Sequence, residues 1–517
     1  MPSSAAPFRR PRQLLILGVL GLCGCVRLGP DFQAPGEAWS RQWSSPALEQ
    51  ASQREQRPDL REWWQVFNDP LLDRLIAAAD AGNADLKIAG LRVMEARARL
   101  GIAESGRYPQ LQQASADSLY LNRRQSGGSN SQDSHFWQHS VGFDVGWELD
   151  FWGRFSRAIE SADASYFAAR ANYEDVLVLL HAQVADTYFA LRTTEARLRV
   201  AKQNARQQQR NFEITEKLFN SGQNAELDLQ QARTQYLGTL STIPSLEDQL
   251  QRTRNALAVL IGQPPGGVPQ LATSDGLIPL VDRAVLQDVP ASLLLRRPDV
   301  RAAELNVAAQ SALIGVAESD FYPSLTLLGS IVWSADSLDG TPRSLDLIGG
   351  PSLRWNLFDH GQISNNVRVQ DARLQQLIEV YRDKVRQAAR EADDAAGGLI
   401  KSLERERILG EAEVAAKRSL VLASAQYREG YSDFQRVLDA QRALLEQQDN
   451  YLVARSNAVS NVIALYKALG GGWSSAQPMV DPATRRQMQE RTDWGDLLDE
   501  PGVAQPAFPQ PDEVKTP

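Results

Sequence analysis

Apolar residues recur at every seventh position along a stretch of the chain that contains neither proline nor glycine. The positions are Leu177, Val184, Leu191, Leu198, Ala205, Phe212 and Phe219. A strict seven-residue repeat is typical of a coiled-coil seam and imposes a left-handed supercoil. Residues 161–220 hold no proline or glycine, and a helix of that length extends about 90 Å at 1.5 Å per residue. We therefore predict one very long helix over residues 151–220.

The repeat stops at Gly222 and then resumes with the same spacing. The second series is Leu229, Tyr236, Ile243, Leu250 and Leu257. Glycine favours the positive φ of a tight turn, so we predict a tip at Gly222 and an antiparallel return helix over residues 223–262. Pro244 lacks a backbone donor and clashes with the preceding turn, which predicts a break or kink near residues 242–245. A helical hairpin with a purely scaffolding role is the alternative that this pattern leaves open.

Between residues 111 and 149 the period of the pattern changes to two. Val141, Phe143, Val145, Trp147 and Leu149 alternate with glycine and acidic residues. This alternation predicts a strand over residues 136–149 with one apolar and one polar face, paired with a strand over residues 111–122. Such strands suit the wall of a transmembrane β-barrel. A hairpin of a soluble sandwich is the alternative.

Much of this pattern occurs twice. Residues 101–111 (GIAESGRYPQL) return as residues 315–325 (GVAESDFYPSL), and the spacing that relates Trp147 to Trp355 also relates Gly222 to Gly430. We therefore predict two structural repeats, residues 63–270 and 271–470, each made of helix, two strands, long helix and return helix. The second repeat is expected to contain a helix over 291–321, strands over 323–333 and 345–357, a long helix over 360–428 and a return helix over 431–469.

Four strands are too few to close a barrel in a membrane. Open sheet edges do not occur in lipid, and bacterial barrels begin at about eight strands. One chain therefore contributes part of a wall, and several copies must complete it. The fold class that we predict is mixed α and β, with coiled-coil hairpins forming a ring and four strands per chain joining a membrane β-barrel; the family resemblance given below implies that these are an α-barrel and an outer-membrane β-barrel.

The N-terminus has the pattern of a lipoprotein signal. Basic residues at positions 9, 10 and 12 precede a short apolar core over residues 14–22, and Leu22 and Gly24 precede Cys25 as in a lipobox. We predict a signal peptide over residues 1–24, lipidation of Cys25 and an extended strap over residues 25–62. An ordinary signal with an incidental cysteine is the alternative. We predict that the Pro-rich and acidic segment 471–517 is disordered.

Composition argues against several other classes of protein. The net charge of −8 argues against a nucleic-acid partner. The two cysteines both lie near the N-terminus and cannot stabilise the fold by disulfide bonds. His135 and His139 lie four residues apart, but a structural or solvated role is the favoured reading. The sequence contains no phosphate-binding loop, GxSxG, HExxH or CxxC motif. We therefore expect no enzyme activity, no cofactor and no metal site.

Several segments together resemble one family, the bacterial outer-membrane factors of the TolC/OprM-like type. The segments are residues 22–35 (LCGCVRLGPDFQAP), 63–70 (WWQVFNDP), 290–304 (PASLLLRRPDVRAAE), 315–325 and 437–442 (VLDAQR). The chain looks most similar to the lipoprotein branch of tripartite RND-type efflux systems, often labelled NodT-type. The resemblance implies a homotrimer with a twelve-strand barrel in the outer membrane. It also implies a periplasmic adaptor protein, an inner-membrane RND-type pump as the energy source, and contact with outer-membrane lipid.

The same resemblance implies a gate at the hairpin tips, with Gly222 and Gly430 in the turns and near the adaptor. The implied gate residues are Asp439 in an acidic constriction ring, Asp228 in the first tip, and the apolar neighbours Phe434 and Val437. Arg436 stands where the family often has a second aspartate, and Ser432 stands where some members carry a gating arginine. The local field of the resting gate is therefore expected to differ. An ordinary solvated carboxylate is the alternative for Asp439.

The function predicted from these observations is a passive exit duct for small toxic compounds. An outer-membrane duct of a type I protein secretion system is the alternative, and the lipobox and the WWQVFNDP segment favour efflux. A coiled-coil scaffold is disfavoured by the alternating strands. The substrate is not encoded in any motif, although four methionines and four histidines give little sign of a copper relay.

Overall fold

The computed structural model describes residues 26–36, 60–123, 134–268, 277–282, 296–336, 344–473 and 479–498. The chain divides into two compact units, which are described separately here. One unit contains the sheet and residues 26–36, and the other contains the helical hairpins. Cys25, the predicted signal peptide and strap residues 37–59 lie outside the described residues.

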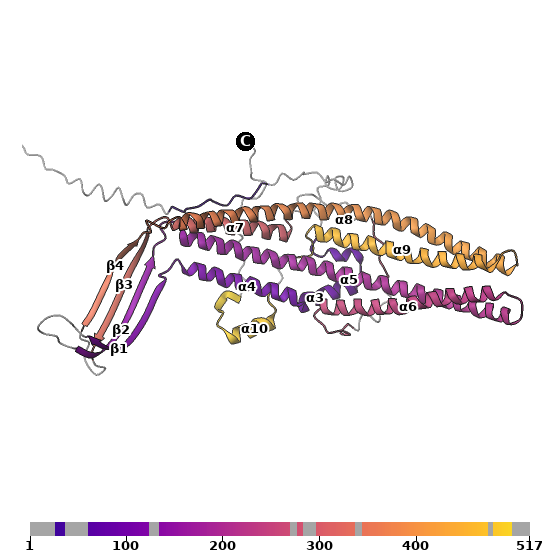
Figure 1. The fold of residues 1–517 in the computed structure, drawn as a ribbon, viewed down its shortest axis with the longest axis horizontal. Coiled ribbons are helices and arrows are strands. Elements are labelled where there is room, and N and C mark those ends of the chain that lie inside the picture. Colours follow the sequence, from indigo (N-terminus) through magenta and orange to yellow (C-terminus); the bar gives the residue numbers. More distant parts are fainter. Residues whose placement is uncertain are drawn as a thin grey trace, which may run out of the picture. The chain divides into compact units, whose positions relative to one another are not determined.

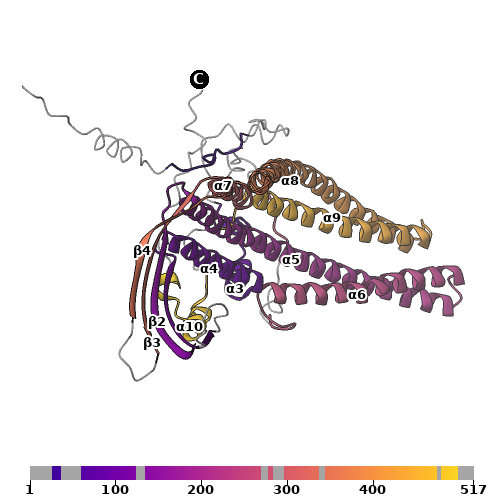
Figure 2. The same ribbon diagram turned by 60° about the vertical axis from the view of Figure 1, so that its left-hand side comes forward.

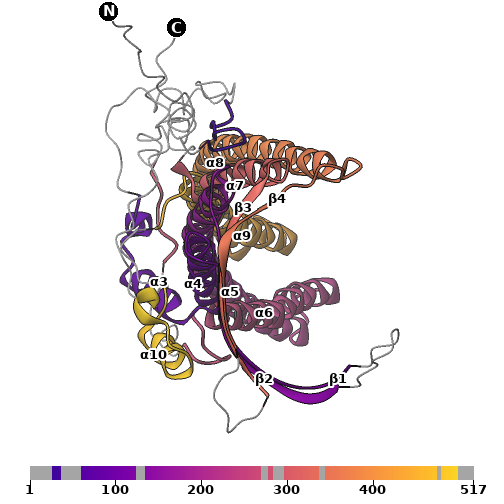
Figure 3. The ribbon, with the colours of Figure 1, turned by 90° about the vertical axis from the view of Figure 1, so that its left-hand side faces the viewer.

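The sheet consists of four antiparallel strands in the order β1-β2-β3-β4 (Figure 1). The strands are β1 (Leu111–Arg123), β2 (Ser134–Glu148), β3 (Ser324–Ala335) and β4 (Ser344–Arg354). They lie within a few residues of the ranges that the sequence predicted. Seen nearly edge-on, the sheet is curved (Figure 3).

The strand register places apolar side chains on one face of the sheet. Phe143 of β2 lies opposite Ile331 of β3, which lies opposite Leu347 of β4. All three side chains are exposed in the single chain. On the other face, the hydroxyl of Ser330 donates a hydrogen bond of 2.6 Å to the carboxylate of Asp144. The exposed apolar face matches the side of a barrel wall that meets lipid.

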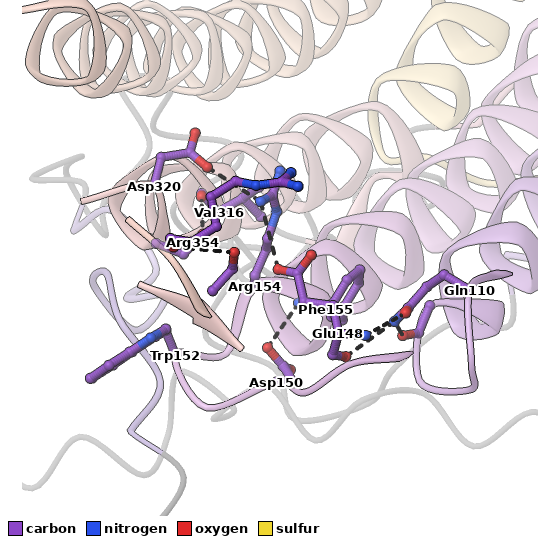
Figure 4. A network of polar contacts seen from close by, with 12 residues as sticks. Gln110, Glu148, Asp150, Trp152, Arg154, Phe155, Val316, Asp320 and Arg354 are labelled. Carbon is purple, nitrogen blue, oxygen red and sulfur yellow. Dashed lines mark hydrogen bonds and ion pairs between the residues drawn. The ribbon is translucent and has the colours of Figure 1, made fainter. Parts of the chain in front are cut away.

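A polar network joins the strand ends to the following helix (Figure 4). Asp150 accepts a 3.2 Å hydrogen bond from the amide of Phe155 and therefore caps α5 (Arg154–Asn220) at its first turn. The guanidinium of Arg154 lies 3.4 Å from the carboxylate of Asp320 and 3.9 Å from that of Glu148. These contacts fix the direction in which α5 leaves β2.

The helical hairpins repeat with equal lengths. Helices α5 and α8 (Gln362–Arg428) each contain 67 residues, and α6 (Glu226–Leu260) and α9 (Phe434–Ala468) each contain 35. Helices α4 (Ala84–Ser105) and α7 (Pro298–Ser319), which precede the strand pairs, each contain 22. Helices α5 and α6 lie side by side as an antiparallel pair, as do α8 and α9 (Figure 2). The internal repeat that the sequence predicted is confirmed.

Of the break or kink predicted near residues 242–245, the break is wrong, because α6 is continuous from Glu226 to Leu260. The kink stays a prediction. Pro244 is on the exposed side of the helix, where water can solvate the carbonyl that lacks its partner. That carbonyl belongs to Leu240, four residues before Pro244, and Leu240 is itself exposed. The local loss of a backbone donor is therefore tolerated without ending the helix.

The predicted disordered tail is also wrong for residues 479–498. Helix α10 (Pro482–Arg491) begins after Asp481, whose carboxylate accepts hydrogen bonds from the amides of Ala483 and Thr484. It is followed by the 3-10 helix η5 (Gly495–Leu498), and Met488 and Leu498 are buried. A capped start and two apolar anchors are sufficient to order a polar segment.

The WWQVFNDP segment forms a packing element of the helical unit. Its residues make the 3-10 helix η1 (Trp63–Phe67) and the start of α3 (Pro70–Gly82). Trp63 stacks on Tyr466 with ring centroids 5.3 Å apart. Asp69 caps α3 by accepting from the amide of Leu71 at 2.9 Å, and its other oxygen accepts from the hydroxyl of Tyr188. The segment ties α3 and α9 to the middle of α5.

A partly buried carboxyl group in α5 predicts a measurable pH dependence. Burial raises the pKa of Asp175 to about 6; the neighbouring carboxylate of Asp299 adds to this effect, and Arg297 and Lys384 oppose it. The folded state holds this proton more tightly than the unfolded chain, so stability falls as the pH rises from about 4 to about 6. Asp175→Asn is expected to stabilise the protein by about 2 kcal/mol at pH 7 and to have little effect below pH 4. Unfolding midpoints at the two pH values test this, with the exposed Glu216→Gln as the control.

Candidate functional site

The two hairpin tips have nearly identical turns. Gly222 has a φ of 78° and Gly430 a φ of 77°, in the left-handed region that favours glycine. The amide of Gln223 donates to the carbonyl of Leu218 at 2.8 Å, and that of Tyr431 donates to Gln426 at 2.9 Å. These bonds close the last turns of α5 and α8. Apart from the adjacent residues of the chain, no atom of the described residues lies within 4 Å of a Cβ built on either glycine, so the tips present open surface.

Side chains connect the first hairpin to the second near the tips. The amide nitrogen of Asn224 donates to the hydroxyl of Tyr427 at 3.2 Å. The Nε of Arg442 in α9 donates to the Oε1 of Gln235 in α6 at 2.6 Å. Sequence reasoning missed both contacts, because the heptad pattern does not show which residues face the other hairpin.

An apolar cluster also lies between the hairpins, and we call it the tip cluster. Its buried members are Ala232, Phe434, Val437 and Leu438, with Phe212, Leu420, Ala423 and Tyr427 packed against them. Phe434 and Val437 are therefore 5% and 4% exposed and lie in the core of the chain itself. This placement revises the expectation that they surround an opening beside Asp439.

Asp439 lies on the exposed face of α9, with its side chain 59% exposed. Its Oδ1 accepts from the Nε2 of Gln435 at 3.0 Å and lies 3.5 Å from the Nη1 of Arg442. The neighbouring guanidinium of Arg442 also contacts the first hairpin. The carboxylate is thus available to a partner molecule while one of its oxygens is held by α9.

The other predicted gate residues lie at the helix starts. Asp228 is half-buried in the first turn of α6, where the helix dipole favours a negative charge. Arg436 is exposed and lies 4.0 Å from Asp433, whose carboxylate caps α9 through the amide of Arg436. Ser432 donates its hydroxyl hydrogen bond to the carbonyl of Asp433. Among the described residues, neither Arg436 nor Ser432 has a hydrogen bond or ion pair to the first hairpin.

In the sheet unit, the N-terminal strap is bound to α5 at a defined position. The side chain of Arg157 is buried and donates to the carbonyls of Leu28 at 2.9 Å and Gly29 at 3.2 Å, and to the carboxylate of Asp31 at 2.8 Å. The amide of Leu28 donates to the carbonyl of Trp152 at 3.2 Å. The strap therefore begins, three residues after Cys25, in a fixed position on α5.

Gly315 makes room for this strap, which allows a matched test. A Cβ on Gly315 would lie 2.4 Å from the carbonyl oxygen of Leu28. A Cβ on its repeat counterpart Gly101 would meet no atom of the described residues within 4 Å outside its own stretch of helix. Gly315→Ala is expected to release the strap and to speed hydrogen exchange at the Leu28 amide by about tenfold or more. Gly101→Ala is expected to leave that exchange unchanged, because alanine there only improves helix propensity. Equal exchange rates in the two variants would contradict the packing of the strap against Gly315.

An exposed apolar sheet face and two long hairpins per chain define the class of channel-forming outer-membrane proteins. A model of the family described as outer membrane efflux protein matches residues 75–263 and 289–471. The chain belongs to this family.

Individual relatives resemble the chain over nearly their whole length. Pyoverdine export outer membrane protein OpmQ of Pseudomonas putida is 33% identical over 478 residues, which cover 90% of this chain and 99% of that protein. Cation efflux system protein CusC of Escherichia coli is 31% identical over 471 residues, covering 88% and 97%. The solved outer-membrane channel OprN superposes with a TM-score of 0.79 at 32% identity, covering 86% of this chain and 99% of OprN.

These findings establish an outer-membrane efflux channel with periplasmic helices, and they confirm the fold class. Members of the family are passive channels and not enzymes. In the part of the chain that the structure describes, no helix is long and apolar enough to cross a membrane. The described residues also contain no group of three histidine, cysteine or acidic side chains that could hold a metal ion.

Proposed function

We propose that three copies of this chain form a passive exit duct for small compounds. In this assembly the twelve strands close a barrel in the outer membrane and the helical hairpins close a ring in the periplasm. The observation that supports it most directly is a four-stranded sheet with an exposed apolar face. The apolar face suits lipid, but the two open edges of the sheet do not, so strands of other copies must pair with them. The mass of the purified protein in detergent tests the assembly. Three copies are expected, and a stable monomer would contradict it.

Exposed apolar residues on the helices support the same assembly. Helix α8 carries a series of them, namely Val369, Val380, Ile408, Val414, Val421 and Leu422. Large exposed apolar surfaces mark interaction sites in soluble regions. A neighbouring copy of the chain would cover these residues in the ring.

The substrates and partners that we propose follow from the relatives. The names of two relatives refer to export of pyoverdine and of cations, and that of a third, SrpC of Pseudomonas putida, to a solvent efflux pump. All three refer to small compounds, which favours efflux over a type I secretion duct. We propose a periplasmic adaptor that contacts the tips at Gly222 and Gly430, and an inner-membrane RND-type pump that supplies the energy. Capture of such a pump by the tagged protein after cross-linking would support this pairing, whereas capture of an ATP-driven protein exporter would favour the secretion duct.

The gate that we propose lies at the tips, where Asp439 of each copy forms an acidic ring with Asp228 nearby. Three carboxylates around one axis attract cations and repel anions. The contacts of Asn224 with Tyr427 and of Gln235 with Arg442 hold the two hairpins of each copy together. Opening requires the adaptor to separate them.

We further propose that Cys25 carries the lipid anchor. Each buried CH₂ group of an acyl chain adds about 0.8 kcal/mol of membrane affinity. A fatty-acid probe is expected to label the wild type and not Cys25→Ser, and equal labelling would exclude the assignment. The substituted protein is still expected to assemble, because the barrel inserts by its own apolar face.

A further inference from the structure

The contacts between α5 and α9 change in character along the two helices. Arg197 of α5 binds Asp449 of α9 with two hydrogen bonds of 2.6 and 3.0 Å. Seven residues closer to the tips, Asn204 donates to the Oε1 of Gln448 at 3.1 Å. The tip cluster, which is apolar, follows nearer the tips. A polar layer therefore separates the tip cluster from the ion pair.

The unusual member of this layer is Gln208, one helical turn beyond Asn204. Its side chain is only 3% exposed, and neither its Nε2 nor its Oε1 has a hydrogen-bond partner in the described structure. Gln441 on α9 is also buried, and its Oε1 is likewise without a partner there. Most buried polar side chains in folded proteins are hydrogen-bonded, and an unpaired one is unfavourable.

Polar neighbours on α8, the other helix of the second hairpin, surround Gln448 at the same level. Gln448 also approaches Glu413, with 3.5 Å between Nε2 and Oε1, and Glu406 is buried. Polar residues at positions of a coiled-coil seam reduce stability. Contact between α5 and α9 at this layer therefore involves polar side chains, including the unpaired amide of Gln208, whereas the tip cluster is apolar.

We propose that Gln208 is a positioning residue of the gate and that the buried amide layer is the place where the two hairpins bend apart. The inference rests on the proposed gating of the tips. When the hairpins separate, water or another amide reaches Gln208 and satisfies it, so part of the loss of tip-cluster packing is offset. The unpaired amide thus keeps the linked arrangement only moderately favoured, and an adaptor needs less binding energy to open it.

The test measures the distance between the two tips within one chain. Spin labels on cysteines introduced at the exposed positions Gln223 and Glu429 report this distance, with labelled chains diluted into unlabelled ones. Gln208→Met removes the amide and keeps the volume of the side chain. The variant is expected to lower the ratio of chains with separated tips to chains with tips in contact by about fivefold or more. The free-energy cost of one unpaired buried amide corresponds to roughly that factor.

The matched control is Gln207→Met, because Gln207 is the exposed neighbour of Gln208 on the same helix. This variant is expected to show the distance distribution of the wild type. The thermal unfolding midpoint of Gln208→Met is expected to rise, which shows that the variant is folded. A purely structural role would raise that midpoint without changing the distances, and equal distance distributions for the two variants would overturn the proposal. The distance measurement does not depend on transport. A channel that fails to conduct would therefore refute the proposed duct, and the distances would still test the role of Gln208.

Discussion

Arg297→Ala is expected to lower the free energy of unfolding by about 3–5 kcal/mol, because it removes one partner from a buried ionic cluster. Arg297 is 7% exposed. Its guanidinium donates two hydrogen bonds of 3.0 Å to Asp299 and one of 2.9 Å each to the Glu391 carboxylate and the Ala468 carbonyl. Without it, two carboxylates lose their counter-charge and the end of α9 loses a bond.

The adjacent arginine supplies the control for this prediction. Arg296 is exposed, and Arg296→Ala is expected to change the unfolding free energy by less than about 0.5 kcal/mol. Arg297→Lys is expected to be intermediate, because lysine keeps the charge but lacks the planar fork that binds Asp299. Thermal unfolding midpoints and the yield of assembled protein measure the effect. Similar losses for Arg296→Ala and Arg297→Ala would show that the cluster does not carry the stability assigned to it.

Asp439→Ala is expected to have the largest effect on transport. In the proposed ring it removes one charge from each copy at the narrowest point, so the resting conductance is expected to rise and the preference for cations to weaken. Growth in the presence of large antibiotics that are normally excluded provides a second measurement.

Glu446 provides a matched control for Asp439. It is an exposed acid seven residues further along α9, on the same side of the helix but about two turns further from the tip than Asp439. Glu446→Ala is expected to leave resting conductance and ion preference close to the wild-type values. If both variants behave like the wild type in an assembled trimer, the constriction does not lie at Asp439.

Periodic patterns allowed much of this fold to be predicted from sequence. The seven-residue repeats predicted the long helices, the alternation around Phe143 predicted the strand faces, and the glycines at 222 and 430 predicted the tips. These features depend on local geometry, which the spacing of residue types records directly. The resemblance between the two halves then extended each prediction from one repeat to the other.

Features that depend on tertiary neighbours were not predictable in this way. Phe434 and Val437 read as apolar seam positions, but only the packing of one hairpin on the other shows that they are buried in the tip cluster. Arg157 carried no motif, and its role depends on a strap more than 120 residues away in sequence. Pro244 was judged from the helix alone, without the solvent exposure that makes it tolerable.

The identity of the candidate site was predicted in part. The acidic position at Asp439 came from the VLDAQR segment, and the structure shows that its side chain is exposed. Gln208 was overlooked, although a polar residue beside the seam positions Ala205 and Phe212 was a visible signal. The segments that carried the family resemblance, such as RRPDVRAAE, turn out to contain packing and ion-pair residues such as Arg297.

The most direct test of the account is the current through the purified protein in a planar lipid bilayer. We predict small, cation-selective single-channel steps for the wild type and larger, less selective steps for Asp439→Ala. The same preparation must be shown to be trimeric and inserted. An inserted trimer that conducts no ions in either form would contradict the conclusion that this chain builds a passive exit duct.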